Sequence, residues 1–233
     1  MSNITDALAE VRGRIEAAAQ RADRPGSDVT LVAVSKTRTV EETREAIDAG
    51  AVDLGENYVQ EMVEKWRALG TEPGRELRWH AIGHIQRNKV KYIAPFCHLI
   101  HSIDSTRLAD EVNKRAGQAE RTQPVLIELN IAQEDSKFGA TADGARALAE
   151  YVAGLPHIEL QGLMAMTPYD ISADESRAYF AQVRELSETL GANLPRAAMQ
   201  ALSMGMTQDY EVAVEEGATI VRVGTAIFGH RAI

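Results

Sequence analysis

A single lysine, Lys36, follows a continuous apolar run in the segment 30–36, which reads Thr-Leu-Val-Ala-Val-Ser-Lys. Such a run, without helical spacing, predicts a buried strand, and strand alternation places Lys36 on the same face as Val32 and Val34. Partial burial lowers the pKa of an ammonium group, and a neutral lysine amine can form a Schiff base with an aldehyde. The alternative is a lysine whose amine simply reaches solvent from the end of its strand.

An arginine, Arg222, stands in the middle of another predicted strand near the end of the chain. Ile220, Arg222 and Gly224 share one face of this strand, while Val221 and Val223 share the other. The two valines are suited to pack on helices, so Arg222 is expected to point to the inner side of the sheet. A buried guanidinium needs acceptors. These are either an internal carboxylate or the heterocyclic nitrogen of a ligand, as in some pyridoxal phosphate sites.

Two turns of small residues follow the last two predicted strands, one at Gly224 and Thr225 and one from Ser203 to Thr207. Exposed N–H groups at helix starts, hydroxyls and glycines bind anions, and these two loops commonly hold phosphate in barrel enzymes. Either turn alone could serve only a tight bend. Together with the lysine and the arginine, they fit a phosphorylated pyridine aldehyde better than a sugar phosphate, which needs no Schiff base.

Eight predicted strands alternate with helical patterns and would position these residues. The strands are expected at 30–36, 51–57, 77–83, 99–104, 124–130, 160–166, 201–205 and 219–224. This alternation over 233 residues favours an α/β fold of the closed (β/α)8 TIM-barrel type over an open doubly wound sheet. A further helical pattern over residues 3 to about 22 predicts an extra N-terminal helix. We expect one domain over residues 1–233, with the polar groups around one barrel mouth.

The composition narrows the class of protein. The formal net charge of -9 argues against a nucleic-acid partner, which would be bound by clustered lysine and arginine. Cys97 is the only cysteine, so no internal disulfide can form and a reducing compartment is expected. The N-terminus lacks a signal pattern, and no apolar run approaches the length of a membrane span. We therefore expect a cytoplasmic protein with no membrane partner.

Motifs that resemble those of a known family run through nearly the whole chain. They are Leu31-Val-Ala-Val-Ser-Lys-Thr37, Gly55-Glu-Asn-Tyr-Val-Gln-Glu61, Trp79-His-Ala-Ile-Gly-His-Ile-Gln-Arg-Asn-Lys89, His101-Ser-Ile-Asp104, Ser136-Lys-Phe-Gly139, Gly162-Leu-Met164, Ser203-Met-Gly-Met206 and Val221-Arg-Val-Gly-Thr-Ala-Ile-Phe-Gly229. On these motifs the chain resembles the pyridoxal 5'-phosphate homeostasis proteins, also called the YggS/PROSC family. One departure is Ala81, where the family usually has an aromatic residue.

The resemblance implies a barrel like the N-terminal domain of alanine racemase, with pyridoxal 5'-phosphate held as a Schiff base on Lys36. By the same resemblance, Arg222 would face the pyridine nitrogen. Four residues would hold the phosphate: Ser203, Met204, Gly224 and Thr225. Two residues would line the ring: Asn57 and Met164.

Catalysis of the racemase type needs a second acid/base on the opposite face of the cofactor from the lysine. In alanine racemases this group comes from an additional β-domain and its dimer partner, whereas this chain stops at Ile233. An arginine at the pyridine nitrogen also weakens the ring as an electron sink. We therefore predict a monomeric binding protein, not an enzyme, that stores or buffers pyridoxal phosphate or delivers it to recipient apo-enzymes. The alternative is a weak amino-acid racemase or other small pyridoxal phosphate enzyme, with Tyr58 or His80 as the second acid/base.

Other reactive side chains receive simpler interpretations. Four histidines lack further ligands at metal-binding spacing, so no metal site is expected: His80, His84, His98 and His101. Lys137 is a second amine near the expected mouth, either an ordinary loop residue or a transient second acceptor for the aldehyde. Cys97 is interpreted as a core or loop thiol, because no paired base is evident.

Overall fold

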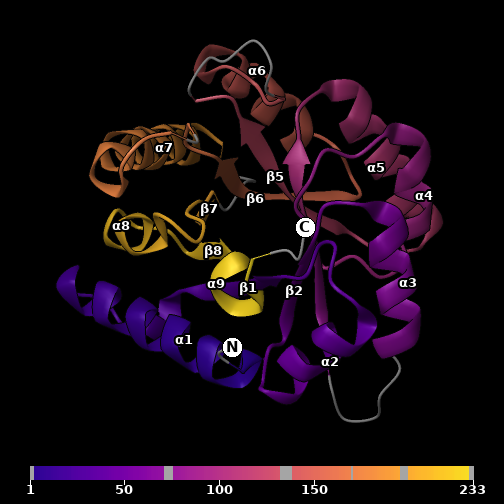
Figure 1. Ribbon diagram of the computed structural model, residues 1–233. Coiled ribbons are helices and arrows are strands. Elements are labelled where there is room, and N and C mark those ends of the chain that lie inside the picture. The colour runs from indigo at the N-terminus through magenta and orange to yellow at the C-terminus, as the bar shows by residue number, and fades with distance from the viewer. Residues whose placement is uncertain (1–2, 71–75, 132–137, 169, 195–198, 231–233) are drawn as a thin grey trace.

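Eight parallel strands form a closed barrel in a computed structural model that describes residues 3–70, 76–131, 138–168, 170–194 and 199–230 (Figure 1). Neighbours in the barrel follow the order of the chain, and β8 pairs with β1 to close it. The strands are β1 (Thr30–Val34), β2 (Asp53–Glu56), β3 (Arg78–Ala81), β4 (Leu99–Ile103), β5 (Gln123–Leu129), β6 (Ile158–Ala165), β7 (Ala201–Ser203) and β8 (Ile220–Val223). The prediction of a (β/α)8 TIM barrel is confirmed.

Helices form a ring around this barrel (Figure 1). They are α1 (Ile4–Arg21), α2 (Val40–Asp48), α3 (Val59–Leu69), α4 (Val90–Ile93), α5 (Thr106–Gln118), α6 (Ala142–Ala153), α7 (Ala173–Asn193), α8 (Tyr210–Glu215) and α9 (Thr225–Phe228), with short 3-10 turns at Gly26–Asp28 and Arg87–Lys89. Several helices start where the sequence provides a cap. Thr39 and Glu42 form a capping box at α2, for example, which satisfies two backbone N–H groups.

The N-terminal helix α1 completes the outer ring. The helix that follows β8, α9, has only four residues, so it leaves part of the outer face of the barrel uncovered. Helix α1 contacts α8, α9 and α2 and thus covers this part. Arg14 and Arg21 on α1 form ion pairs with Glu211 and Glu215 on α8. The predicted extra helix is therefore an integral part of the barrel.

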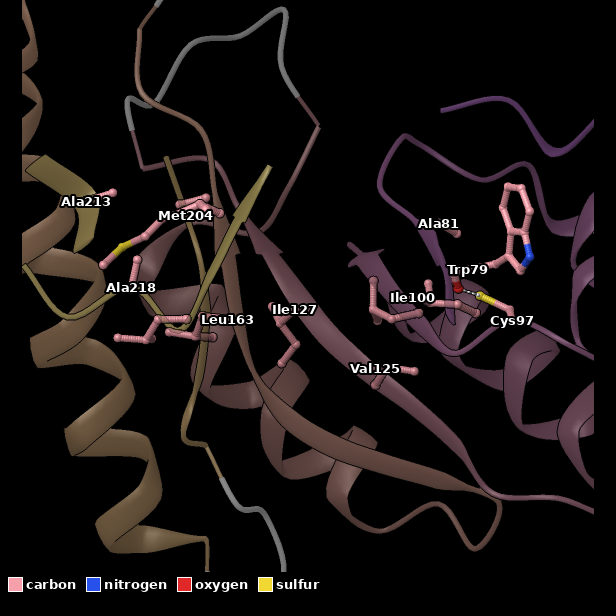
Figure 2. Close-up of a cluster of buried hydrophobic side chains, with 14 of the residues drawn as sticks. Trp79, Ala81, Cys97, Ile100, Val125, Ile127, Leu163, Met204, Ala213 and Ala218 are labelled. Carbon is pink, nitrogen blue, oxygen red and sulfur yellow. Dashed lines mark hydrogen bonds between the residues drawn. The ribbon is translucent and has the colours of Figure 1, made fainter. Parts of the chain in front are cut away.

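Apolar side chains form two separate layers, because the strands are buried on both faces. The larger layer lies between strands and helices, and Figure 2 shows part of it, including Trp79, Ala81 and Cys97. The smaller layer fills the interior of the barrel with Val32, Leu99, Leu126, Met164 and Ile220. This division confirms the alternation predicted for β8, since Val221 and Val223 belong to the outer layer.

Cys97 is a core thiol, as predicted. It is fully buried, and its Sγ lies 3.6 Å from the carbonyl oxygen of Trp79 (Figure 2). Burial raises the pKa of this thiol to about 12. The thiol is therefore protonated at neutral pH and has no catalytic character.

In the described ranges, no helix is both long and apolar enough to span a membrane.

Candidate functional site

Lys36 lies in the turn directly after β1, at the end of the barrel where all eight parallel strands terminate. The turn is closed by a hydrogen bond of 2.9 Å from the Arg38 N–H to the Ser35 carbonyl. On its other side, the Ser35 N–H donates to the Gly55 carbonyl of β2. The lysine side chain is half-buried. The predicted position at the barrel mouth is confirmed, because βα loops meet at this edge.

Beneath this turn lies a buried ion pair that the sequence analysis did not identify. The Lys65 ammonium on α3 lies 2.6 Å from Glu56 Oε1 at the end of β2. The same carboxylate oxygen accepts a hydrogen bond of 2.7 Å from the Ser35 hydroxyl. Burial raises the pKa of Glu56, and the charge of Lys65 opposes this effect. Only the packing of α3 on β2 brings these charges together, so sequence spacing alone gave no signal.

Arg222 points into the barrel, as its position on β8 predicted. Its Nη1 donates to the Ser203 carbonyl at 2.7 Å and to the Ser203 hydroxyl at 2.5 Å, and its Nη2 donates to the Ala165 carbonyl at 3.0 Å. Burial lowers the pKa of Arg222 to about 10, against the opposing effect of Glu128 and Asp209. The guanidinium is still charged at neutral pH. Its hydrogen-bond acceptors are carbonyl and hydroxyl oxygens, which carry no formal charge. The positive charge of Arg222 therefore faces the barrel interior without a carboxylate in direct contact.

A chain of hydrogen bonds runs from Arg222 across the barrel interior. The Ser203 hydroxyl accepts from Arg222 and lies 2.8 Å from His101 Nδ1. His101 Nε2 lies 3.0 Å from His80 Nδ1, and His80 Nε2 lies 2.9 Å from the Asp53 carboxylate. Each group can donate one proton to the next if both imidazoles are neutral and protonated on Nε2. This direction of donation follows from the arginine, which can only donate.

Electrostatics agree with a neutral His101 imidazole in this chain of hydrogen bonds. Burial and the charges of His80 and Arg222 hold the pKa of His101 well below its ordinary value. At the far end, burial raises the pKa of Asp53, but hydrogen bonds from His80 and Arg78 outweigh this effect and lower it. Both ring nitrogens of His80 are occupied and the side chain is buried. His80 is therefore badly placed to act as the second acid/base of a racemase.

Glu128 is a further functional candidate that the sequence analysis did not identify. It lies on the inner face of β5, in register with Met164 of β6, and is only 4% exposed. Its Oε2 has no hydrogen-bond partner among the described residues. Burial and the charge of Asp104 raise its pKa to about 7, although Arg222 opposes them. Strand alternation could have revealed it, because Glu128 shares its face with Leu126 of the inner layer.

Of the four residues predicted to hold phosphate, Gly224 and Thr225 lie beside the end of β1. A Cβ atom on Gly224 would lie 3.3 Å from the Val34 carbonyl oxygen, so the two chain segments approach closely. Thr225 is exposed at the first position of α9. Ser203 lies deeper, with its hydroxyl in the hydrogen-bond chain of the interior.

Met204, the fourth of these residues, is turned away from the mouth. Its side chain belongs to the outer apolar layer, near Ala213 and Ala218 (Figure 2). Its backbone N–H donates to the Ile220 carbonyl at 3.1 Å. The Met204 side chain therefore does not face the mouth, and a role of this residue in holding phosphate stays a prediction.

The residues predicted to line the ring lie at different depths. Asn57 follows β2 and is half-buried, and a Cβ on Gly83 would lie only 2.7 Å from its carbonyl oxygen. Met164 is fully buried in the inner apolar layer. Tyr58, the other candidate acid/base, is 57% exposed at the start of α3. Lys137 falls outside the described residues.

Comparison with protein families gives one full-length match. The model described as "Alanine racemase, N-terminal domain" matches residues 7–232. Among curated proteins, the chain is 43% identical to the pyridoxal phosphate homeostasis protein of Aquifex aeolicus, over 98% of this chain and 99% of that protein. It is 41% identical to the protein of the same name from Escherichia coli, over 99% of this chain and 98% of that protein.

Solved structures give a consistent comparison. PipY of Synechococcus elongatus with pyridoxal phosphate bound matches with a TM-score of 0.84 and 34% identity, over 97% of this chain and all of that one. The form of PipY without the cofactor matches with a TM-score of 0.86. An alanine racemase of Clostridium difficile has a TM-score of 0.74 at 14% identity, over 99% of this chain and 60% of that one. This last likeness concerns the fold alone.

Proposed function

Because the chain belongs to the pyridoxal phosphate homeostasis proteins, on a barrel of the alanine racemase N-terminal type, we propose that it binds pyridoxal 5'-phosphate and serves the intracellular homeostasis of this cofactor. The cofactor is held as a Schiff base on Lys36, and the protein stores it, buffers it or delivers it to recipient apo-enzymes. The observation that carries this proposal is the position of Lys36 at the barrel mouth, above a buried and charged Arg222.

The donor set fits each chemical group of this cofactor. A lysine amine suits the aldehyde, and the turn at Gly224 and Thr225, which lies against the end of β1, suits the phosphate. A guanidinium suits an unprotonated pyridine nitrogen, because it can only donate. Bound pyridoxal phosphate supplies an electrophilic aldehyde and, when its ring nitrogen is protonated, a strong electron sink. Arg222 opposes that protonation, which favours holding the cofactor over using it in catalysis.

Several finer points belong to the same proposal. We expect a monomer that works in the cytoplasm. The single, buried Cys97 fits a reducing compartment. A weak racemase activity would need an acid/base opposite Lys36. The enclosed position of His80 argues against that residue in this role.

The test is an absorption spectrum of the purified protein after addition of pyridoxal phosphate. Wild type should form a visible-range Schiff-base band that is absent in Lys36→Ala. Lys114→Ala is the matched control, because Lys114 is an exposed lysine in the second half of helix α5 and is not among the residues expected at the site. Amino acids are then added, and the products are separated on a chiral column. No band in the wild type would refute the proposal, and racemisation that depends on Lys36 would refute the carrier assignment.

A further inference from the structure

Helix α3 holds the backbone on both sides of Lys36. The Lys65 ammonium donates to the carbonyl of Ser35 at 2.6 Å. The Glu61 carboxylate accepts a hydrogen bond of 2.7 Å from the Thr37 N–H. The residue before Lys36 and the residue after it are thus tied to one helix, by two side chains four positions apart.

The buried ion pair explains how a lysine can reach Ser35 from inside the protein. Lys65 is only 3% exposed, and its charge is matched by Glu56 at 2.6 Å. Buried ion pairs are often no more stabilising than apolar residues of similar size, because both charges lose their hydration. Their better-supported benefit is to specify one arrangement of the chain. In this protein the ion pair fixes the conformation of the Lys36 turn, because Lys65 donates to the Ser35 carbonyl and Glu56 accepts from the Ser35 hydroxyl.

The conformation of Thr37 indicates that this turn needs to be held. Its φ angle is 63°, in the left-handed region that β-branched residues seldom adopt. A residue keeps such a strained backbone conformation only where contacts with its neighbours hold it there. Residues of this kind are found most often at functional sites. The hydrogen bond from the Thr37 N–H to Glu61 is one such determinant.

We propose that Lys65 and Glu61 are positioning residues, which hold the Lys36 turn in the geometry that reacts with the aldehyde. This inference rests on the proposed function, because it assigns a role in forming the Schiff base on Lys36. Addition of an amine to a carbonyl requires close and oriented reacting atoms, and a displacement of about 1 Å can lower a rate by about 100-fold. Loss of either contact releases one side of the turn and slows formation of the Schiff base.

The main test uses Glu61→Ala, with Glu64→Ala on the same helix as its matched control. Glu61 is about one-third exposed and Glu64 is exposed, so both variants should fold. The first measurement is hydrogen exchange at the Thr37 amide in the cofactor-free protein. The second is the rate at which the visible band appears after pyridoxal phosphate is added. Glu61→Ala should lose amide protection and react about tenfold more slowly, while Glu64→Ala should match the wild type.

A second set of variants tests the backbone conformation and Lys65. Glycine adopts positive φ without penalty, so Thr37→Gly in the Glu61→Ala background should recover part of the lost rate. The double variant Lys65→Met/Glu56→Gln lacks both buried charges and the donor to Ser35. It should also form the Schiff base with pyridoxal phosphate slowly. The proposal would be overturned if the visible band appeared equally fast in the wild type, in Glu61→Ala and in the double variant Lys65→Met/Glu56→Gln. That result differs from failure of the proposed function, in which even the wild type forms no band.

Discussion

Glu128 makes the stability of the cofactor-free protein depend on pH in a predictable direction. Its pKa is raised from 4.5 to about 7. The folded state therefore binds this proton more tightly than the unfolded state does. The resulting stabilisation is complete below about pH 4.5 and is lost as the pH rises through about 7. At about 1.4 kcal/mol per pKa unit, the ionised carboxyl costs the folded protein about 3 kcal/mol.

The assay is urea unfolding at about pH 5.5, 7 and 8.5, compared between the wild type and Glu128→Gln. Glutamine keeps the shape of the side chain but does not titrate. Between about pH 5.5 and 8.5, the wild type should lose about 2 kcal/mol of unfolding free energy relative to this variant. Asp104 and Arg222 act on the Glu128 carboxyl, so their effects on its pKa are part of the difference that this comparison measures.

Glu159→Gln is the matched control, because Glu159 is a strand glutamate on β6 that is exposed. It should follow the wild type at each pH. Parallel pH profiles for wild type and Glu128→Gln would refute the reasoning, since they would mean that the Glu128 carboxyl is equally easy to ionise in the folded and unfolded states.

Two further predictions concern buried polar groups. Ser203→Ala should lower the unfolding free energy by about 1–3 kcal/mol, because it leaves His101 Nδ1 without its partner and removes one acceptor of Arg222. The assay is urea unfolding, in which the control Ser27→Ala, at an exposed serine, should show no such loss. Cys97 should resist an aromatic disulfide reagent at pH 8 in the native protein and react fully in guanidinium chloride, because the thiol is buried and its pKa is about 12. Rapid reaction of the native thiol would contradict this placement.

Strand alternation alone was enough to place Lys36 and Arg222. Arg222 lies on the inward face of β8, and Lys36 lies in the turn just after the end of β1, where the strand pattern had put it. The contacts of Arg222 were less predictable. The sequence left a carboxylate or a ligand nitrogen as its acceptor, whereas three oxygens of Ser203 and Ala165 accept in the structure. Backbone carbonyls are present at every residue, so only the register of β6, β7 and β8 decides which of them an arginine reaches.

Residues that act through tertiary packing could not be identified from spacing. Lys65 looks like an ordinary helix-surface lysine until α3 packs on β2 and presents it to Ser35. The pairing of His80 with His101 likewise depends on the alignment of β3 with β4. Met204 shows a further limit, because strand alternation from the inward-facing Ser203 already places its side chain in the outer layer, where the structure has it. Only the family resemblance assigned Met204 to the phosphate.

The acceptors of Arg222 bear directly on the proposed carrier function. Two of them are backbone carbonyls and the third is the Ser203 hydroxyl, which is itself positioned by His101. The guanidinium is therefore held in place by the protein alone. A side chain that is already ordered loses little conformational entropy when a ligand arrives, so it binds and releases the ligand without rearrangement. A protein that loads and unloads one cofactor repeatedly would benefit from such a rigid site. On this argument, Ser203→Ala should weaken cofactor binding as well as folding, because Arg222 would regain freedom that binding must then remove.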